Sequence, residues 1–318
     1  MRNNKTDKQK KTSAQVTNDI CQRVTDKLVA LMESGVNPWR KPWNSGECAA
    51  VSHNTGAPYS LINQILLGFR GGEYLTFNQV KKEGGNVKKG AKGQQIIFWQ
   101  PSGFKKVPEK PVEKTVTNAE GETGENEKEE TFVFKGAILK AYTVFHIEDC
   151  EGIEAKHPYE VAKRDFNPDE EAERLAAEYC GRHGITLDID RRDNAFYRPS
   201  DDSVHVPLRE QFKNTEEFYS TLYHELGHST GHESRLDRIT KTYFGSEAYS
   251  REELVAEITA ATCLAHLGID TDGSDKNSAA YLKAWAQFLK SDPRAIVVAA
   301  GKAEKAFNMI VGMEAKAA

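Results

Sequence analysis

The chain has 318 residues, of which 38% are hydrophobic and 28% are charged. This length corresponds to about two domains, and the composition excludes a wholly disordered chain. No apolar run reaches the roughly 18 residues that span a bilayer, and residues 1–12 lack the apolar core of a secretory signal. The five cysteines are scattered without a C-x-x-C pair. We therefore expect a cytoplasmic protein with reduced thiols and no membrane partner.

Charge is unevenly distributed along the chain. Residues 1–100 carry 15 Lys+Arg against 7 Asp+Glu, whereas residues 151–318 carry 21 against 30. A basic front and an acidic back indicate two modules with different partners. The basic half is the candidate for phosphate contact, although a solvated cationic surface explains the charge equally well.

The front module begins with a polar, Lys-rich tail over residues 1–13, which we expect to be disordered. Apolar residues at helical spacing then predict a helix from Ala14 to Ser34, with Gly35 at its C-cap. The Pro- and Trp-rich segment 37–44 excludes regular helix. Further along we expect a short helix at Leu61–Leu67 and strands at Gln95–Trp99, Thr131–Lys135 and Ala141–Ile147.

An acidic segment and a linker divide the chain. Residues 101–131 contain eight glutamates and three prolines, which is typical of a flexible insertion. Residues 151–166 are the predicted linker between a first domain, 14–150, and a second domain, 167–318. The fold class predicted for both domains is α+β.

The second domain opens with clear helix signals. Asn167 is the expected N-cap, Pro168 falls at the first helical position and Gly184 follows the end. Three short strands come next, at 185–189, 195–198 and 203–206, with the spacing of an antiparallel meander. Four helices follow, starting near Thr215, Ser250, Asn277 and Pro293.

The strongest motif is His224-Glu225-Leu226-Gly227-His228, an H-E-x-x-H pattern. Residues four apart on a helix share a face, so both imidazoles can bind one ion. We predict one Zn2+ per chain, with other divalent metals as alternatives. Glu225 is the candidate general base, because its carboxylate can take the proton of a water that attacks a carbonyl.

The third ligand is open from the residues alone. Position 234 is Ser, which disfavours the metzincin pattern. His232 continues the i+4 series, but Gly227 and Gly231 make a straight helix through it doubtful. Glu253 and Glu257 on the next helix resemble the gluzincin arrangement, in which the first carboxylate binds metal and the second supports a ligand histidine. Glu253 could instead close a capping box with Ser250. The remaining alternatives are Glu257, Glu252 or an aspartate.

Other residues near the motif have weaker assignments. Tyr243 and Tyr249 are candidates for hydrogen bonding an oxyanion, although structural tyrosines are more common. The strand 203–206 corresponds by analogy with zincin peptidases to an edge strand that pairs with substrate. His205 on that strand is expected to be a strand residue rather than a ligand.

The front module carries aromatic residues interleaved with cations, which is typical of surfaces that stack bases and neutralise phosphates. No helix-turn-helix or zinc-finger pattern is present, so single-stranded DNA is the predicted partner. A structural core role is equally consistent with each tryptophan. The candidate DNA-binding residues are Trp39, Arg40, Lys41, Trp43, Tyr59, Lys88, Lys89, Lys92 and Trp99.

Taken together, these motifs resemble the ArdC family of plasmid antirestriction proteins over nearly the whole chain. The front resembles a domain shared with plasmid primases, in Pro38-Trp39, Tyr74-Leu-Thr-Phe-Asn-Gln79 and Val87-Lys-Lys-Gly90. The back resembles that family's metallopeptidase-like domain. The resemblance implies single-stranded DNA binding, a zincin fold and protection of conjugative DNA from restriction. The sequence departs from it in the long acidic insertion and in Phe145-His146, where Phe-Asn is more usual.

Two functions follow as hypotheses. The first is a zinc-dependent peptidase delivered to DNA, with a host DNA-bound protein or a restriction enzyme as its substrate. The second is a non-catalytic protein that coats single-stranded DNA and has a structural metal, or a primase-associated DNA-binding protein. Glu225 favours the first, because a purely structural zinc site needs no general base.

Overall fold

The computed structural model describes residues 11–40, 49–101, 104–106, 132–134, 137–158, 167–239, 247–269 and 279–313. The chain forms two compact units. One comprises residues 1–20 with 97–141, and the other comprises residues 21–96 with 142–318. These units cut the chain differently from the predicted domains, whose boundaries stay a prediction. Most of the predicted tail, acidic insertion and linker lies outside the described residues.

Helix α1 (Ser13–Glu33) follows the prediction closely. Its buried residues Ile20, Val24 and Leu28 recur every four positions, so one face packs into a core. Gly35 ends the helix with a φ of +87°, a conformation that glycine adopts without strain. None of the described helices combines the length and apolar character that crossing a bilayer requires.

A four-stranded sheet follows, with the order β1-β2-β7-β4. Strand β1 pairs parallel to β2, and β2 pairs antiparallel to β7. The predicted strands at 95–99 and 141–147 are longer here, as β4 and β7, and the predicted short helix is α2. The sheet and its flanking elements are β1 (Ala50–Ser52), α2 (Leu61–Leu66), β2 (Gly72–Thr76), α3 (Phe77–Lys82), β4 (Gln94–Pro101), β7 (Ala137–His146) and η1 (Ile147–Asp149). Two small antiparallel ladders accompany it: β3 (Asn86–Val87) pairs with β8 (Cys150–Glu151), and β5 (Phe104–Lys106) pairs with β6 (Phe132–Phe134).

The chain after β8 is anchored to this sheet, although the sequence predicts a linker there. The carboxylate of Glu73, on β2, accepts hydrogen bonds from the backbone N–H groups of Lys156 and His157 at 3.2 and 2.6 Å. The same carboxylate lies 2.5 Å from Nδ1 of the fully buried His53. Residues 153–158 are therefore held against β2.

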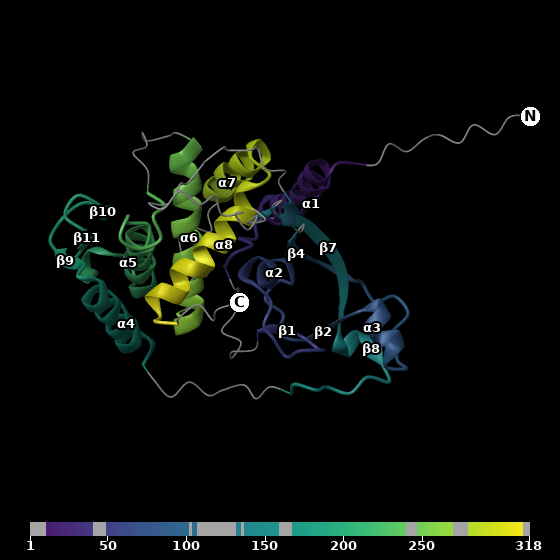
Figure 1. Cartoon of the computed structure of the whole chain (residues 1–318). Coiled ribbons are helices and arrows are strands. Elements are labelled where there is room, and N and C mark those ends of the chain that lie inside the picture. The colour runs from purple at the N-terminus through teal and green to yellow at the C-terminus, as the bar shows by residue number, and fades with distance from the viewer. Residues whose placement is uncertain are drawn as a thin grey trace, which may run out of the picture. The chain divides into compact units, whose positions relative to one another are not determined.

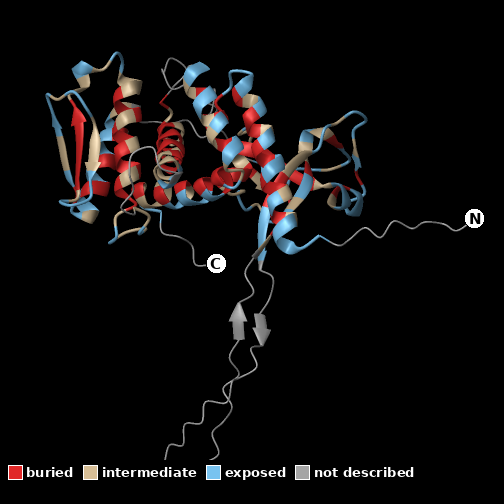
Figure 2. Cartoon of the chain, turned by 90° about the horizontal axis from the view of Figure 1, so that it is seen from above, coloured by how far each residue is buried: buried red, intermediate tan, exposed pale blue. Residues whose placement is uncertain are grey.

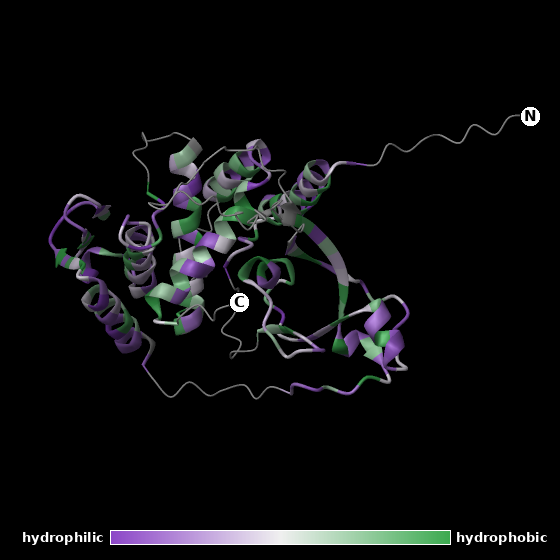
Figure 3. Ribbon diagram, in the orientation of Figure 1, coloured by the Kyte–Doolittle hydropathy of each residue, from purple (hydrophilic) through white to green (hydrophobic). Residues whose placement is uncertain are grey.

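The second part of the fold opens with α4 (Pro168–His183), which is largely hydrophilic in Figure 3. Asn167 caps this helix by accepting from the N–H of Asp169 at 3.1 Å. Gly184 ends it with a φ of +69°. Both caps confirm the sequence-based prediction.

The predicted antiparallel meander is wrong. Strands β9 (Thr186–Asp190), β10 (Phe196–Arg198) and β11 (Ser203–Pro207) form a sheet with the order β10-β11-β9. Strand β11 is antiparallel to β10 but parallel to β9. Because β11 inserts between the two earlier strands, it is buried along its whole length (Figure 2).

Four α-helices follow in the described part of the chain: after η2 (Arg209–Gln211) come α5 (Thr215–Ser229), α6 (Glu247–Leu267), α7 (Ala279–Ser291) and α8 (Ala295–Ile310). Helix α5 packs on α6, and α6 packs on α8 (Figure 1). Helix α6 contains Ser250 within its first turn, so the predicted start at Ser250 is wrong. Ser250 and Glu253 therefore do not occupy the positions of a capping box.

Candidate metal centre

Helices α5 and α6 bring the candidate metal ligands together. Asn214 caps α5 by accepting from the N–H of Glu217 at 2.8 Å, and this cap begins the helix ten residues before His224. A Cβ atom on Gly227 would lie 3.2 Å from Cα of Ala256 on α6. Glycine at this position therefore allows the two helices to approach closely, next to both histidines.

Three ligand atoms converge at this contact. One ligand atom from each of His224, His228 and Glu253 lies within 4.8 Å of the other two. The two Nε2 atoms are 3.1 Å apart, and each lies 3.3 Å from a carboxylate oxygen of Glu253. Tetrahedral zinc with bonds of about 2.0–2.2 Å separates its ligands by roughly 3.3–3.5 Å. The donor set and its spacing therefore fit a divalent cation.

The carboxylates make this site attractive to positive charge. Burial lowers the pKa of His228, but its hydrogen bonds to the accepting carboxylates of Glu252 and Glu253 outweigh burial and raise that pKa to about 10. The pKa of Glu253 shifts in the opposite direction: burial raises it, and the two imidazoles lower it well below its usual range. A divalent cation can replace the protons that these groups share.

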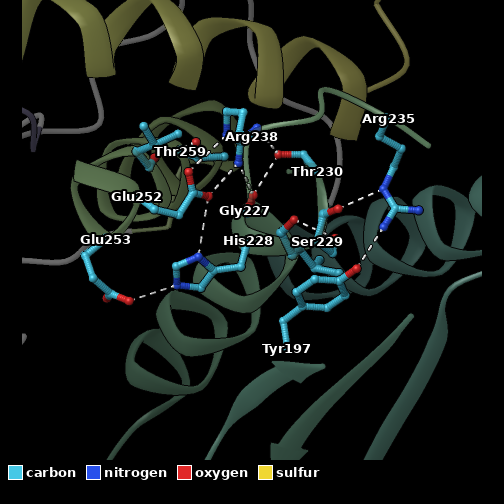
Figure 4. Close-up of polar contacts among 12 residues, drawn as sticks. Tyr197, Gly227, His228, Ser229, Thr230, Arg235, Arg238, Glu252, Glu253 and Thr259 are labelled. Atoms are coloured by element: carbon cyan, nitrogen blue, oxygen red, sulfur yellow. Dashed lines mark hydrogen bonds and ion pairs between the residues drawn. The ribbon is translucent and has the colours of Figure 1, made fainter. Parts of the chain in front are cut away.

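Each imidazole has a second carboxylate on its other side. Nδ1 of His224 lies 3.1 Å from Oε1 of Glu257, the residue that the sequence suggests as a support for a ligand histidine. Nδ1 of His228 lies 3.6 Å from Oε1 of Glu252. Figure 4 shows His228 between Glu252 and Glu253. Such partners orient ligand histidines and select the nitrogen that faces the metal.

Arg238 connects Glu252 to the end of α5. Its Nη2 atom donates to Oε1 of Glu252 and to the carbonyl oxygen of Gly227, both at 2.9 Å. Its Nη1 atom donates to Oγ1 of Thr230 at 2.8 Å. The guanidinium is almost fully buried, so this charge-assisted network holds Glu252 against His228.

The segment after α5 turns away from the site. Helix α5 ends at Ser229, and Nδ1 of His232 hydrogen bonds to Ser234 at 2.8 Å. Arg235 donates to the Ser229 carbonyl oxygen at 2.7 Å and to both carboxylate oxygens of Asp202 (Figure 4 shows the first contact). Among the described residues, the converging ligand set includes Glu253 and not His232.

Two further polar side chains lie near the ligands. Glu225 is 8% exposed, and its charge contributes to raising the pKa of both His228 and Tyr249. Burial, together with Glu253 and Glu225, raises the pKa of the Tyr249 phenol to about 12. Tyr249 therefore keeps its proton at neutral pH and can donate a hydrogen bond. Tyr243, the other oxyanion candidate, lies outside the described residues.

The analogy that made strand 203–206 a substrate-binding edge is wrong. Strand β11 pairs on both sides, so its backbone groups are not available to a peptide. His205 is a strand residue, as expected. It stacks on Phe196 with ring centroids 4.5 Å apart and hydrogen bonds to Ser203 at 2.7 Å.

The candidate DNA-binding residues separate by burial. Trp39 and Arg40 are only 2% and 7% exposed, so the hypothesis that they contact bases or phosphates needs correction. Tyr59 is half-buried and packs edge-on against Tyr74. Trp99 is 53% exposed, and the side chains of the 88–92 loop are also accessible. The exposed candidates are Lys88, Lys89, Lys92 and Trp99, whereas Lys41 and Trp43 lie outside the described residues.

Comparisons with known proteins agree with this geometry. Residues 18–145 match the model for the N-terminal domain of the anti-restriction factor ArdC, and residues 170–302 match that for a zincin-like metallopeptidase. The crystal structure of antirestriction protein ArdC from plasmid R388, in its metal-free form, is 31% identical with a TM-score of 0.64. It covers 92% of this chain and 96% of its own. This chain belongs to the ArdC family of antirestriction proteins. The α+β, zincin-like architecture predicted for it is confirmed.

Other relatives differ in how much of their own length this chain covers. The Mn(II)-bound structure of the R388 protein is equally similar, at 31% identity and a TM-score of 0.64, and covers 94% of this chain and 99% of its own. A DNA primase TraC from Escherichia coli is 34% identical over 313 residues, and an uncharacterized protein of Sinorhizobium fredii, y4eC, is 29% identical over 301. The match to this TraC includes 95% of the present chain, and the match to y4eC includes 92% of it. The chain spans 28% of that primase, 20% of a second TraC from the same species, and 91% of y4eC.

Sequence reasoning missed part of the support around the ligands. It considered Glu252 as an alternative ligand, and the structure places it behind His228 instead. Arg238 was not considered at all. The only sequence signal for it is a cation close to the end of the motif helix, which is too common to indicate a role.

Proposed function

We propose that this chain is a zinc-dependent peptidase of the gluzincin type, carried by a module that binds single-stranded DNA. In this proposal, it protects DNA that enters a cell by conjugation from restriction. One observation carries the enzymatic part: Nε2 of His224, Nε2 of His228 and the Glu253 carboxylate converge beside the buried Glu225. A purely structural zinc site usually has four protein ligands and needs no adjacent general base.

His224, His228 and Glu253 would hold the metal. When bound, it would act as a Lewis acid and lower the pKa of a water molecule. Glu225 then accepts the proton of the attacking water and passes it to the leaving amine. Tyr249, whose phenol keeps its proton at neutral pH, would donate a hydrogen bond to the oxygen that becomes negative. Two imidazoles and one carboxylate favour zinc, and the relative from plasmid R388 binds Mn(II).

The DNA-binding part rests on exposed side chains of the basic half. Trp99 presents its ring to solvent, and Lys88, Lys89 and Lys92 lie on an exposed, glycine-flanked loop. Aromatic stacking contributes about 1–3 kcal/mol per base without sequence preference. The match to primases TraC also supports DNA as the partner.

Glu225→Gln tests the enzymatic part, because the amide is isosteric but cannot accept the proton. We expect unchanged metal content and DNA binding, but loss of protection when a plasmid is transferred into a restricting recipient. Glu233→Gln is the matched control, since Glu233 is exposed and lies five residues after His228, the end of the motif. If Glu225→Gln protects fully, the alternative holds: a non-catalytic coat on single-stranded DNA with a structural metal, or a primase-associated DNA-binding protein.

A further inference from the structure

The segment Asn37–Arg40 is buried and contacts helices of the second half of the chain. Trp39 packs edge-on against Trp285 of α7, with ring centroids 6.0 Å apart and an interplanar angle of 88°. Nη2 of Arg40 donates to Oγ of Ser220 at 3.3 Å. Ser220 lies on α5, one helical turn before His224. These buried residues therefore contact α7 and α5, the helix of both ligand histidines, rather than solvent.

A continuous set of contacts leads from Trp39 to the first ligand. Trp285 lies next to Tyr281, with ring centroids 6.2 Å apart in an edge arrangement. The Tyr281 hydroxyl donates to Oε2 of Glu257 at 2.6 Å. The other oxygen of this carboxylate is the one 3.1 Å from Nδ1 of His224. We call Trp39, Trp285 and Tyr281 the aromatic layer.

Arg40 lies within electrostatic reach of this layer. Burial and the neighbouring Glu257 raise the pKa of Tyr281, and the positive charge of Arg40 opposes that rise. Arg40 therefore acts on the Tyr281 hydroxyl through its charge and is hydrogen-bonded to α5 through Ser220. A buried guanidinium that donates to a helix restrains that helix.

We infer that Arg40 and the aromatic layer position His224 for metal binding, by fixing the Glu257 carboxylate behind it. The Tyr281 hydroxyl bonds to one oxygen of that carboxylate while the other oxygen faces Nδ1 of His224, so losing the hydroxyl weakens the restraint on the carboxylate. Outer partners of this kind typically change metal affinity 10–100-fold. This inference rests on the proposed metal site, and it gives residues of the N-terminal half a role in that site.

The test is the affinity of the full-length chain for Mn2+, measured from free Mn2+ by electron paramagnetic resonance. Tyr281→Phe removes one hydroxyl, and Arg40→Met removes one charge at similar volume. We expect both to raise the dissociation constant at least roughly fivefold. Arg40→Lys keeps the charge, so we expect it to restore part of the affinity. In the Co2+-loaded chain, Tyr281→Phe should also shift the visible absorption bands that report ligand geometry.

Two matched controls separate positioning from general packing. Tyr219→Phe removes the hydroxyl of a buried tyrosine on α5, the helix of both ligand histidines, and this hydroxyl bonds to the carbonyl oxygen of Asp169. Lys290→Met removes another contact between N- and C-terminal elements, the 2.6 Å ion pair with Glu33. We expect both controls to bind Mn2+ within about twofold of the parent chain.

Three outcomes would overturn the inference or its basis. If Tyr281→Phe binds Mn2+ as tightly as the parent chain, the aromatic layer has no positioning role. If the controls lose as much affinity as the test variants, the effect is general packing. If the parent chain itself binds neither Mn2+ nor Zn2+, the proposed function fails first. Should Arg40→Met not fold, Tyr281→Phe alone decides.

Discussion

Glu257 lies 3.1 Å from the Nδ1 atom of His224, while Glu253, one turn earlier on α6, lies 3.3 Å from Nε2 of the same ring. Two carboxylates of one helix therefore contact opposite sides of one imidazole on another. The packing of α5 on α6 therefore sets the spacing of the candidate metal ligands.

Glu253→Gln should weaken metal binding most, because it replaces a charged ligand by a neutral amide. We expect at least about a 100-fold rise in the dissociation constant for Zn2+ or Mn2+, against roughly tenfold for Glu257→Gln. Metal analysis of the purified variants and competition with a chelator measure both. His232→Ala is the control, since His232 bonds to Ser234 instead. Loss of metal in His232→Ala but not in Glu253→Gln would reverse the ligand assignment.

The stability of the metal-free protein should fall as the pH rises above neutrality. The pKa of His228 is raised from 6.5 to about 10 in the folded chain. Between these values the folded state holds a proton that the unfolded state has released, so the free energy of unfolding decreases with pH. Bound metal occupies the same nitrogen, and metal affinity should therefore rise over this range.

Melting temperatures from about pH 7 to about pH 9, with a chelator or with Zn2+, measure this effect. His228→Gln should remove the part of the slope that belongs to this residue. An identical slope in His228→Gln and the parent chain would contradict the assignment.

Arg235→Met should destabilise the fold. The Arg235 side chain is 2% exposed and pairs with Asp202 at 2.5 Å, so its loss leaves a carboxylate without its main partner. We expect the free energy of unfolding in urea to fall by about 3–5 kcal/mol. Arg198→Met provides the comparison, because its pair with Asp201 is about half exposed and should matter by less than about 1 kcal/mol. Equal losses in both variants would show that burial is not the cause.

Trp99→Ala should weaken binding to a single-stranded oligonucleotide and leave the melting temperature unchanged. Loss of one stacking ring corresponds to about 1–3 kcal/mol in binding free energy. Changing Lys88, Lys89 and Lys92 to Ala should instead reduce the salt dependence of binding, because fewer counterions are released. Trp39→Ala should instead lower the melting temperature and leave oligonucleotide binding by the folded protein unchanged, because Trp39 is buried. Binding that ignores ionic strength would refute the DNA-binding proposal.

Local signals in the sequence predicted most helices correctly. Asn167, Pro168 and Gly184 mark the ends of α4, and Asn214 marks the start of α5, because caps depend on neighbouring residues alone. The H-E-x-x-H spacing places two histidines on one face for the same reason.

Non-local features could not be predicted in this way. Strand β11 pairs parallel to β9, although β10 lies between these two strands in the sequence. This strand order depends on how the sheet packs on α5 rather than on any local pattern. The sequence does not show where α6 begins. Glu253 was therefore ambiguous between a metal ligand and a helix cap, because Ser250 and Glu253 also have the spacing of a capping box. Trp39 beside a cation and proline suggests a DNA contact, but no local pattern distinguishes a buried tryptophan from an exposed one.

The burial of Trp39 against Trp285 limits which fragments of the chain can fold when they are expressed separately. Thr25 also bonds to the Pro293 carbonyl oxygen at 2.9 Å, and Glu304 accepts from the N–H of Leu61 at 3.2 Å. A fragment that begins at residue 167 would expose more of Trp285 and leave the partly buried Glu304 carboxylate without that partner. Such a fragment should aggregate or misfold when expressed alone, so the peptidase-like half depends on its N-terminal neighbour for its own folding.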